Sequence, residues 1–384
     1  MENPVFDYII CGGGASGLLL LYALSEDPFF SKKDILLIEK ESKNTNDRTW
    51  SFWEKKEGAF EGLLEKKWDT ANFLSSSVSL DFKLAPYQYK MLRSKGFYKT
   101  CHEKIERQKN IQYLSAEITS INNEGITSKV STNKGFFSSK NVFNSVFDPT
   151  ALYNQKKYPV LKQHFIGWFI KTKLEQFDPN KILFMDFNIE QKKETRFLYV
   201  LPLDSKNALV EYTLFSANLL EKKEYEEGIQ SYLKNQGIIE YEIKEKEQGN
   251  IPMSSFPFDQ FNTSSLLNIG TAGGWTKAST GFTFMNTTRN VSKVVSFLKT
   301  GKPLNRFNIK NRFSFYDLLF LDVLFKYNSQ GSKLFERMFE KNTPLTIFRF
   351  LDEKTSFVEE LRIASSFSLR QISWFLMALI RRLF

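Results

Sequence analysis

Three glycines near the start of the chain have the spacing of a dinucleotide-binding turn. Gly12, Gly14 and Gly17 form a G-x-G-x-x-G pattern between apolar runs at 5–11 and 18–24. In such a turn the first glycine permits a sharp bend, the second lets the backbone approach a pyrophosphate, and the third lets a helix pack closely on a strand. The pattern therefore predicts a buried strand, a phosphate-binding turn and a buried helix.

A carboxylate ends the next predicted strand. Residues 34–39 are apolar between Asp34 and Glu39, and an acid at this place can accept a hydrogen bond from a ribose hydroxyl group. Glu39 lies 27 residues after Gly12, instead of the usual distance of about 20. An insertion at 27–33 accounts for the difference. Together these elements favour cofactor binding over a chance glycine turn.

A second glycine-rich segment lies about 260 residues further along the chain. The predicted strand 266–270 ends at Gly270, and Gly281 precedes a predicted helix at 282–299. Binding in two parts suits a long cofactor such as FAD. A helix that begins near Gly281 would point its positive end at the flavin ring and favour the reduced, anionic form. A plain loop between strand and helix is the alternative interpretation.

Two acids stand alone in apolar stretches. Glu211 lies within 209–213 (LVEYT) and Asp186 ends 181–186 (KILFMD), both in predicted strands. Burial raises the pKa of a carboxyl group and keeps it protonated, so that it can donate a proton. The alternatives are an exposed face of an alternating strand for Glu211, and a salt bridge or turn cap for Asp186. Acids on neighbouring strands could share one pocket.

Cysteine and histidine are too few for most metal sites. The chain has two of each, Cys11, Cys101, His102 and His164. A four-thiolate zinc site, a disulfide framework and a three-histidine site are therefore excluded. We expect no metal, and we expect the chemistry of an enzyme to rest on carboxyl groups or on a cofactor.

The formal net charge is +10, from 53 basic and 43 acidic residues. Such a surplus favours an anionic partner, either nucleic acid or a membrane surface. Seven bases and no acid lie from Arg289 to Arg312, but no nucleic-acid-binding motif is present, so no nucleic acid partner is expected. No segment has the roughly 18 apolar residues of a spanning helix. Residues 1–8 lack the features of a signal peptide, so the sequence predicts a cytoplasmic protein.

Predicted strands and helices alternate along the 384 residues, which are enough for two or three coupled domains. Further strands are expected at 111–115, 117–121, 165–174, 197–202 and 208–215, with a hairpin within 127–146 and helices at 221–236 and from 313 onward. We predict an α/β fold in three interleaved parts. These are an FAD-binding Rossmann-like domain (1–75, 100–150 and 262–300), a substrate-binding sheet domain (76–99 and 151–261) and a helical C-terminal region (301–384).

Nine segments spread along the chain together match a known family. They are 7–21 (DYIICGGGASGLLLL), 36–39, 48–54 (RTWSFWE), 185–186, 196–203 (RFLYVLPL), 209–213 (LVEYT), 248–253 (QGNIPM), 270–283 (GTAGGWTKASTGFT) and 360–363 (ELRI). The aromatic TWSF segment and the order of Asp, YVLPL and Glu are specific, whereas a generic flavin monooxygenase would share only the glycine pattern. On these segments the chain resembles the bacterial lycopene beta-cyclases, flavoproteins of carotenoid synthesis.

The sequence departs from that family at three places. Arg48 stands where members usually have histidine, Lys277 and Ala278 stand for a His-Pro pair, and Tyr212 stands for an acid that follows the central glutamate. Roles that depend on those family side chains are therefore not carried over to this chain.

The resemblance implies a redox-neutral cyclisation of lycopene or another acyclic carotenoid to beta-ionone rings, giving beta-carotene. An acid protonates a terminal double bond, an internal double bond attacks the tertiary cation, and a base removes a ring proton. The resemblance implies Glu211 as the first catalytic acid, Asp186 as the second, reduced FAD as cofactor and NAD(P)H as electron donor. The 38 phenylalanines supply rings that could stabilise a cation.

Lycopene dissolves in bilayers, so the implied enzyme must reach a membrane without spanning it. Residues 369–384 place apolar side chains at helical spacing, with Arg370, Arg381 and Arg382 available to phospholipid head groups. An amphipathic helix packed on the protein body is the alternative. We expect peripheral binding at the inner face of the cell membrane.

Two other functions fit the sequence. An FAD-dependent monooxygenase or prenyl-chain reductase, acting on an isoprenoid or aromatic substrate, would consume NAD(P)H at every turnover. A cyclase would need reductant only to prime its flavin. A non-catalytic carotenoid- or lipid-binding protein would retain pigment without forming rings.

Overall fold

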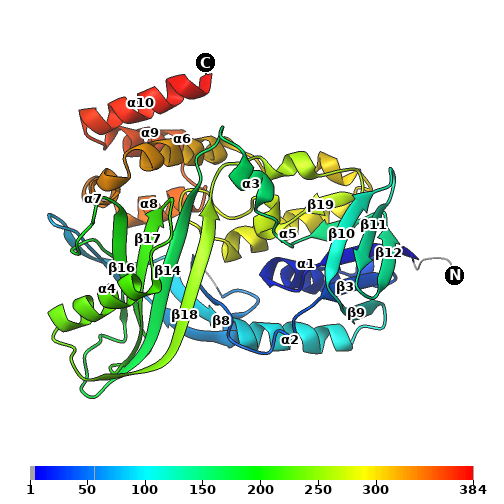
Figure 1. Cartoon of the computed structure of the whole chain (residues 1–384), viewed down its shortest axis with the longest axis horizontal. Coiled ribbons are helices and arrows are strands. Elements are labelled where there is room, and N and C mark those ends of the chain that lie inside the picture. The colour runs from blue at the N-terminus through cyan, green and yellow to red at the C-terminus, as the bar shows by residue number, and fades with distance from the viewer. Residues whose placement is uncertain (1–4, 56, 384) are drawn as a thin grey trace.

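A computed structural model describes residues 5–55 and 57–383 of the chain (Figure 1). Residues 1–4, 56 and 384 lie outside the described residues, and so do, with them, the first residues of the predicted cofactor domain and the last residue of the predicted membrane helix. Figure 1 shows the parallel sheet with α1 at one end of the molecule, the long strands β14 to β18 at the other, and the C-terminal helices along one edge.

A five-stranded parallel sheet carries the glycine turn. Its order is β19-β13-β2-β3-β9, and every neighbouring pair is parallel. The central strand β2 runs directly into the turn and α1, as an apolar strand followed by glycines predicts. Strands β13 and β19 come from distant parts of the chain but lie beside β2, which brings the second glycine-rich segment to the first. The bounds are Tyr8–Cys11 (β2), Ile35–Glu39 (β3), Ile111–Ser115 (β9), Val142–Asn144 (β13), Leu266–Asn268 (β19), Ala15–Glu26 (α1), Ser94–Glu106 (α2) and Phe284–Leu298 (α5).

A small four-stranded sheet in the order β1-β12-β11-β10 flanks the parallel sheet. Strands β11 and β12 form the predicted hairpin, with residues 133 and 134 between them. The bounds are Val5–Phe6 (β1), Ile118–Asn123 (β10), Ser128–Thr132 (β11) and Gly135–Ser139 (β12).

The largest sheet has seven strands in the order β18-β14-β17-β16-β15-β6-β7. All neighbours are antiparallel except β15 and β6. Helix α4 packs on one face through an apolar cluster, and the C-terminal helices pack on the other. The bounds are Thr70–Leu74 (β6), Ser79–Lys83 (β7), Leu161–Thr172 (β14), Lys181–Asp186 (β15), Thr195–Pro202 (β16), Asn207–Ser216 (β17), Tyr241–Met253 (β18), Thr150–Asn154 (α3) and Lys222–Asn235 (α4).

A three-stranded sheet, in the order β4-β8-β5, joins the two large sheets. It consists of Thr49–Glu54 (β4), Leu64–Trp68 (β5) and Gln88–Arg93 (β8). The sequence predictions contain none of these strands. The segment 50–64, which holds most of β4, shows neither an alternating nor a helical period.

Five helices complete the chain: Arg312–Lys326 (α6), Gly331–Lys341 (α7), Pro344–Leu351 (α8), Phe357–Ser365 (α9) and Leu369–Leu383 (α10). Their apolar side chains join those of the large sheet in one aromatic-rich core. Of the helices that the structure describes, none is both long and apolar enough to cross a membrane.

The predicted α/β class, with a parallel sheet and a helical C-terminal region, is confirmed. The division into three parts stays a prediction. Within it, residues 70–74 are placed with the cofactor domain, whereas β6 pairs with β15 in the seven-stranded sheet.

Candidate active site

The glycine turn has the backbone geometry that a pyrophosphate requires. Gly12 has a φ of +95°, and its amide donates to the carbonyl of Ile38 at 2.8 Å, which fixes the turn to β3. A Cβ atom on Gly17 would lie 1.9 Å from the Gly12 carbonyl oxygen, so α1 packs too closely for a larger residue. Around Gly14, no described atom lies within 4 Å of the place that a Cβ would take. Space for a phosphate therefore lies beside Gly14.

Glu39 lies against this turn. Its Oε2 atom accepts a hydrogen bond from the Gly13 amide at 2.5 Å, and its Oε1 atom accepts one from the Glu41 amide at 2.9 Å. These bonds hold the carboxylate at the carboxyl end of β3, the place from which an acid reaches a ribose in dinucleotide-binding folds. The structure thus brings Gly12, Gly14, Gly17 and Glu39 together.

The second glycine-rich segment contacts the first. Gly270 has a φ of +59°, and a Cβ atom on it would lie 2.0 Å from the Ser16 hydroxyl at the start of α1. Gly281 has a φ of +73° and lies equally close to the Gln163 side chain. Both glycines are therefore required by close approach of the chain.

The N-terminus of α5 has unsatisfied polar groups. The buried Oε1 atom of Gln163 and the Oγ1 atom of Thr280 have no hydrogen-bond partner among the described residues, and no described side chain caps the helix at Thr283. A buried polar group left unpaired costs about 1–3 kcal/mol. A polar ligand at this helix N-terminus would satisfy these groups, so the residues present fit a flavin ring.

Strand β4 connects this helix N-terminus to the large sheet. On one side, Trp50 and Phe52 stack on Phe284 in the first turn of α5, with ring centroids 5.2 and 5.0 Å apart. On the other side, the Thr49 hydroxyl donates to the Oε2 atom of Glu247 in β18 at 2.5 Å. One short strand therefore contacts both the candidate cofactor site and the carboxyl groups of the sheet.

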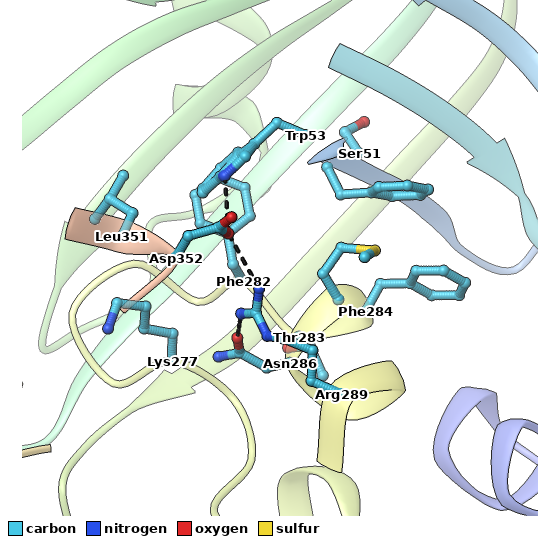
Figure 2. A pocket seen from close by; sticks show the side chains of 12 residues that line it. Ser51, Trp53, Lys277, Phe282, Thr283, Phe284, Asn286, Arg289, Leu351 and Asp352 are labelled. Atoms are coloured by element: carbon cyan, nitrogen blue, oxygen red, sulfur yellow. Dashed lines mark hydrogen bonds and ion pairs between the residues drawn. The ribbon is translucent and has the colours of Figure 1, made fainter. Parts of the chain in front are cut away.

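A small cavity of about 20 Å³ lies between β4, the start of α5 and the segment after α8 (Figure 2). Figure 2 shows Asp352 between Trp53 and Arg289. Its Oδ1 atom accepts from the Trp53 indole at 3.0 Å and from the Arg289 guanidinium at 3.1 Å. These bonds tie the C-terminal region to both β4 and α5.

Glu211 is buried on the face of the large sheet that looks toward β4 and β8. The strand register aligns it with Tyr199 of β16 and Gly167 of β14. The Thr213 hydroxyl donates to its Oε1 atom at 2.5 Å. Burial, and then the charge of Glu247, raise the pKa of Glu211 to about 8. The carboxyl group is therefore mostly protonated at neutral pH, and the alternative of an exposed strand face is excluded.

Two tyrosines lie close to Glu211. The hydroxyl of Tyr199 donates to that of Tyr89 in β8 at 2.7 Å. Burial and the nearby Glu211 carboxyl both raise the pKa of these phenols. The acid therefore lies among neutral aromatic groups, and no described lysine or arginine makes an ion pair with it.

Asp186 lies on the opposite face of the same sheet. Its register partner is Leu198, which faces α4, whereas Glu211 is paired with Tyr199. Its Oδ1 atom accepts from the Asn188 amide at 2.8 Å, and burial raises its pKa. The expectation that Asp186 and Glu211 share one pocket is therefore wrong.

The three positions that depart from the family have different surroundings. Arg48 is exposed and donates to the Asp47 carbonyl. Lys277 is buried in ion pairs with Asp317 at 3.0 Å and Glu353 at 3.3 Å. Tyr212 lies on the α4 face, next to Arg196 and away from Glu211.

Neither Glu247 nor Gly167 is among the site residues predicted from the sequence. Glu247 belongs to β18, whose charged alternation (YEIKEKE) resembles a solvated segment. The period of two in that run is the signal that could have indicated a strand. Nothing in the sequence marks Gly167, because its role depends on which residues lie opposite it.

Comparisons with known proteins agree with this architecture. A family model described as lycopene cyclase protein matches residues 7–378. A search of curated proteins found no match.

Solved structures share the fold at low sequence identity. A geranylgeranyl bacteriochlorophyll reductase-like protein from Thermoplasma acidophilum is 12% identical with a TM-score of 0.66, over 98% of this chain and 100% of that chain. A flavoprotein/dehydrogenase from Cytophaga hutchinsonii is 13% identical with a TM-score of 0.62, over 99% of both chains. The flavin-dependent brominase Bmp2 is 12% identical with a TM-score of 0.60, over 98% and 99%.

Proposed function

Because the chain belongs to the lycopene cyclase family, we propose that it converts the acyclic ends of lycopene into beta-ionone rings by acid–base catalysis. The match of the family model supports the resemblance inferred from the sequence. The observation that carries the proposal is Glu211, a buried carboxyl group with a pKa raised to about 8 among aromatic side chains. Such a group holds a proton at neutral pH where an apolar substrate could receive it.

The proposed reaction balances without an oxidant. Glu211 gives its proton to the terminal double bond of one acyclic end, which becomes a tertiary cation. The electron pair of an internal double bond forms the ring bond, and loss of a ring proton to a base leaves the new ring double bond. Aromatic rings near the acid, including Tyr89 and Tyr199, stabilise the cation through their π faces. One proton enters and one leaves, so the enzyme is an isomerase.

The proposed cofactor is FAD. Gly12, Gly14, Gly17 and Glu39 would hold its pyrophosphate and ribose, and the loop from Gly270 to Gly281 would hold its ring at α5. Reduced flavin, when bound, supplies negative charge that stabilises a nearby cation. NAD(P)H is the proposed electron donor that reduces the flavin before turnover.

The test of the reaction measures product and reductant together. Purified protein with FAD, lycopene in liposomes and NAD(P)H without oxygen should form beta-carotene, with far less NAD(P)H consumed than rings formed. Consumption of one NAD(P)H for each product would instead support a reductase or a monooxygenase. Pigment retention without any ring would support a binding protein.

Gly14→Val tests the cofactor site. The backbone at Gly14, with φ −75° and ψ −173°, suits a valine, and no described atom lies within 4 Å of its Cβ position. The variant should fold normally but lose FAD, because valine would fill the space for a phosphate. Gly62→Val, at an exposed glycine that also has open space around it, is the matched control and should retain FAD. Normal FAD affinity in Gly14→Val would contradict the assignment.

A surface on the last two helices supports the proposed membrane contact. Eight large apolar side chains of α9 and α10 are exposed, and we name this set the C-terminal apolar surface: Phe357, Val358, Leu361, Leu369, Leu376, Met377, Ile380 and Leu383. Both helices lie at the C-terminal end of the molecule (Figure 1). Exposed Arg370 accompanies this surface, as does Arg381, which is exposed although it lies 3.9 Å from Asp322, and both suit contact with anionic lipid.

Other bases are less available to lipid than their number in the sequence suggests. Arg382 makes a bidentate ion pair with Asp322, with both distances 2.6 Å. Four of the seven bases in the 289–312 stretch also make ion pairs within the protein: Arg289, Lys299, Lys310 and Arg312. The C-terminal apolar surface, rather than that stretch, is therefore the proposed contact.

The membrane contact is tested by vesicle flotation. Leu376→Ser/Ile380→Ser should weaken binding to anionic liposomes by about 10- to 100-fold. Full burial of an aliphatic side chain contributes about 1.5–3 kcal/mol, and each of these two side chains has about half of its surface left to bury. The matched control is Ile126→Ser/Ile239→Ser, which removes two exposed apolar side chains elsewhere on the surface. Equal binding by the two double variants would exclude this surface as the contact.

A further inference from the structure

We infer that Glu247 is the second carboxyl group of the active site and acts as a positioning residue that keeps the proton on Glu211. The inference rests on the proposed cyclisation and adds a member to that site. Glu247 belongs to β18, two strands away from Glu211 in β17.

The strand register places the two acids in one row. Gly167 of β14 is paired with Glu211 on one side and with Glu247 on the other. Paired residues of antiparallel strands project from the same face of a sheet. The row therefore runs Tyr199, Glu211, Gly167, Glu247, all on the face toward β4 and β8.

The glycine in the middle of the row leaves the two acids without a side chain between them. A Cβ atom on Gly167 would lie 3.2 Å from Cγ and 3.5 Å from Oε1 of Glu247, and 2.9 Å from Leu209. The side chain of Glu247 therefore extends over Gly167, and the charge of Glu247 is the second-largest cause, after burial, of the raised pKa of Glu211.

The surroundings of Glu211 favour its neutral form. Groups from three strands face it: Tyr199 of β16, Tyr89 of β8 and Glu247 of β18. The tyrosines are neutral at ordinary pH. Only the Thr213 hydroxyl lowers the pKa of Glu211, and this bond is too weak to offset burial and a neighbouring negative charge.

The surroundings of Glu247 favour its ionised form relative to Glu211. The pKa of Glu247 is also raised, because burial is the largest influence on it; the Thr49 hydroxyl, Arg93 of β8 and Arg48 before β4 counteract burial, while Glu245 of its own strand adds to it. Arg93 lies over the Phe169 ring in the same face and bonds Glu245 at 2.5 Å. When two carboxyl groups interact, the one beside the cations ionises first. The negative charge is thus on Glu247 and the proton on Glu211.

The other positions at which the sequence or the family suggests an acid do not supply the negative charge beside Glu211. Asp186 lies on the opposite face, and the family's acid beside the central glutamate is here Tyr212, which also faces α4. Within the described part of the chain, Glu247 is therefore the carboxyl group that lies on the same face as Glu211 and acts on its pKa.

The test is an infrared pH titration of the FAD-loaded protein. Above about pH 6 ordinary carboxyl groups are ionised, so a remaining carboxylic-acid C=O band reports an abnormal group, and Glu211→Gln identifies the band. Glu247→Gln should lower the midpoint of this band by about one pH unit or more, while Glu247→Asp should retain most of the parent value. Thr49→Val, which removes only the hydroxyl bond to Glu247, should lower the midpoint by less.

The rate profile gives the second readout. The alkaline limb of cyclisation should move to lower pH in Glu247→Gln by the same amount as the band. An unmoved band in a folded Glu247→Gln enzyme that still cyclises would overturn the inference and retain the proposed function. If the band shifts in Glu247→Gln but the protein forms no rings, the interaction between the two carboxyl groups is supported and the proposed function is wrong.

Discussion

The two faces of the seven-stranded sheet each bury a carboxylic acid, in different surroundings. On the face toward β4 and β8, Glu211 has a second carboxyl group, Glu247, across Gly167. On the α4 face, Asp186 has a backbone amide and lies near Tyr232. Burial raises the pKa of both acids, so a raised pKa by itself does not distinguish them.

The polar groups of the α4 face are bonded to one another. Arg196 pairs with Glu224 of α4 at 2.7 Å and with Glu194 at 2.6 Å. His164 contacts the hydroxyls of Tyr225 and Ser216. These bonds join helix to sheet and stabilise the fold. On the face toward β4, Arg93 pairs with Glu245 and acts on Glu247, whereas Glu211 makes no ion pair with a described residue and has a second buried carboxyl group as its neighbour. The two buried acids therefore differ in their neighbours, which are a carboxyl group for Glu211 and a backbone amide for Asp186.

Glu211→Gln should give the largest effect. Glutamine preserves size and the bond from Thr213 but carries no transferable proton, and positioned acids contribute about 100- to 10,000-fold to rate. Beta-carotene formed per FAD-loaded enzyme should fall by that factor, with FAD binding and thermal unfolding nearly unchanged. Glu242→Gln, an exposed position of β18, is the control and should have parent activity. Parent turnover in Glu211→Gln would remove this residue from the mechanism.

A pair of glycine substitutions compares the faces directly. Gly167→Ala would press on Leu209 and on the Glu247 side chain, and Gly228→Ala would press on the Tyr212 ring, 2.6 Å from the new Cβ, on the α4 face. Overpacking costs about 1–3 kcal/mol at either site. Only Gly167→Ala should also lower cyclisation, by about 10- to 100-fold, because it displaces one acid relative to the other. Urea unfolding and turnover are measured on both variants, and equal losses of turnover would show that the row has no special role.

The comparison also shows what the sequence can predict. The glycine turn, α1 and β3 follow from short apolar runs and adjacent glycines, which are local signals. The segment 181–186 was likewise recognisable as a strand from its composition, and β15 has those bounds. The buried state of Glu211 depends on both faces of β17 being covered, which the sequence supports through the apolar residues around it.

The local sequence does not determine on which face of the sheet an acid lies. Regular alternation from Leu183, which is paired with Val200, would place Asp186 on the face of Glu211. A bulge between Leu183 and Asp186 puts two residues, Phe184 and Met185, opposite one, and it turns Asp186 to the α4 face. The sequence does not show this bulge, nor the register that sets Glu247 opposite Gly167. Edge strand β18 is equally hard to recognise, because charged residues on an edge resemble a loop.

Asp186→Asn should give the smallest effect on turnover and a distinctive effect on stability. Burial holds the pKa of Asp186 above its usual 3.8 in the folded protein, so the folded state binds this proton more tightly than the unfolded chain. The contribution of Asp186 to the free energy of unfolding is therefore complete below about pH 3.8 and is lost as the pH rises through the folded pKa.

Asparagine at position 186 does not ionise and can still accept the hydrogen bond from the Asn188 amide. Relative to the parent, the variant should thus gain stability between acid pH and neutrality, measured by urea unfolding across that range, while rings form at nearly the parent rate. A loss of turnover as large as that of Glu211→Gln would show that Asp186 also takes part in catalysis and that both faces of the sheet carry functional acids.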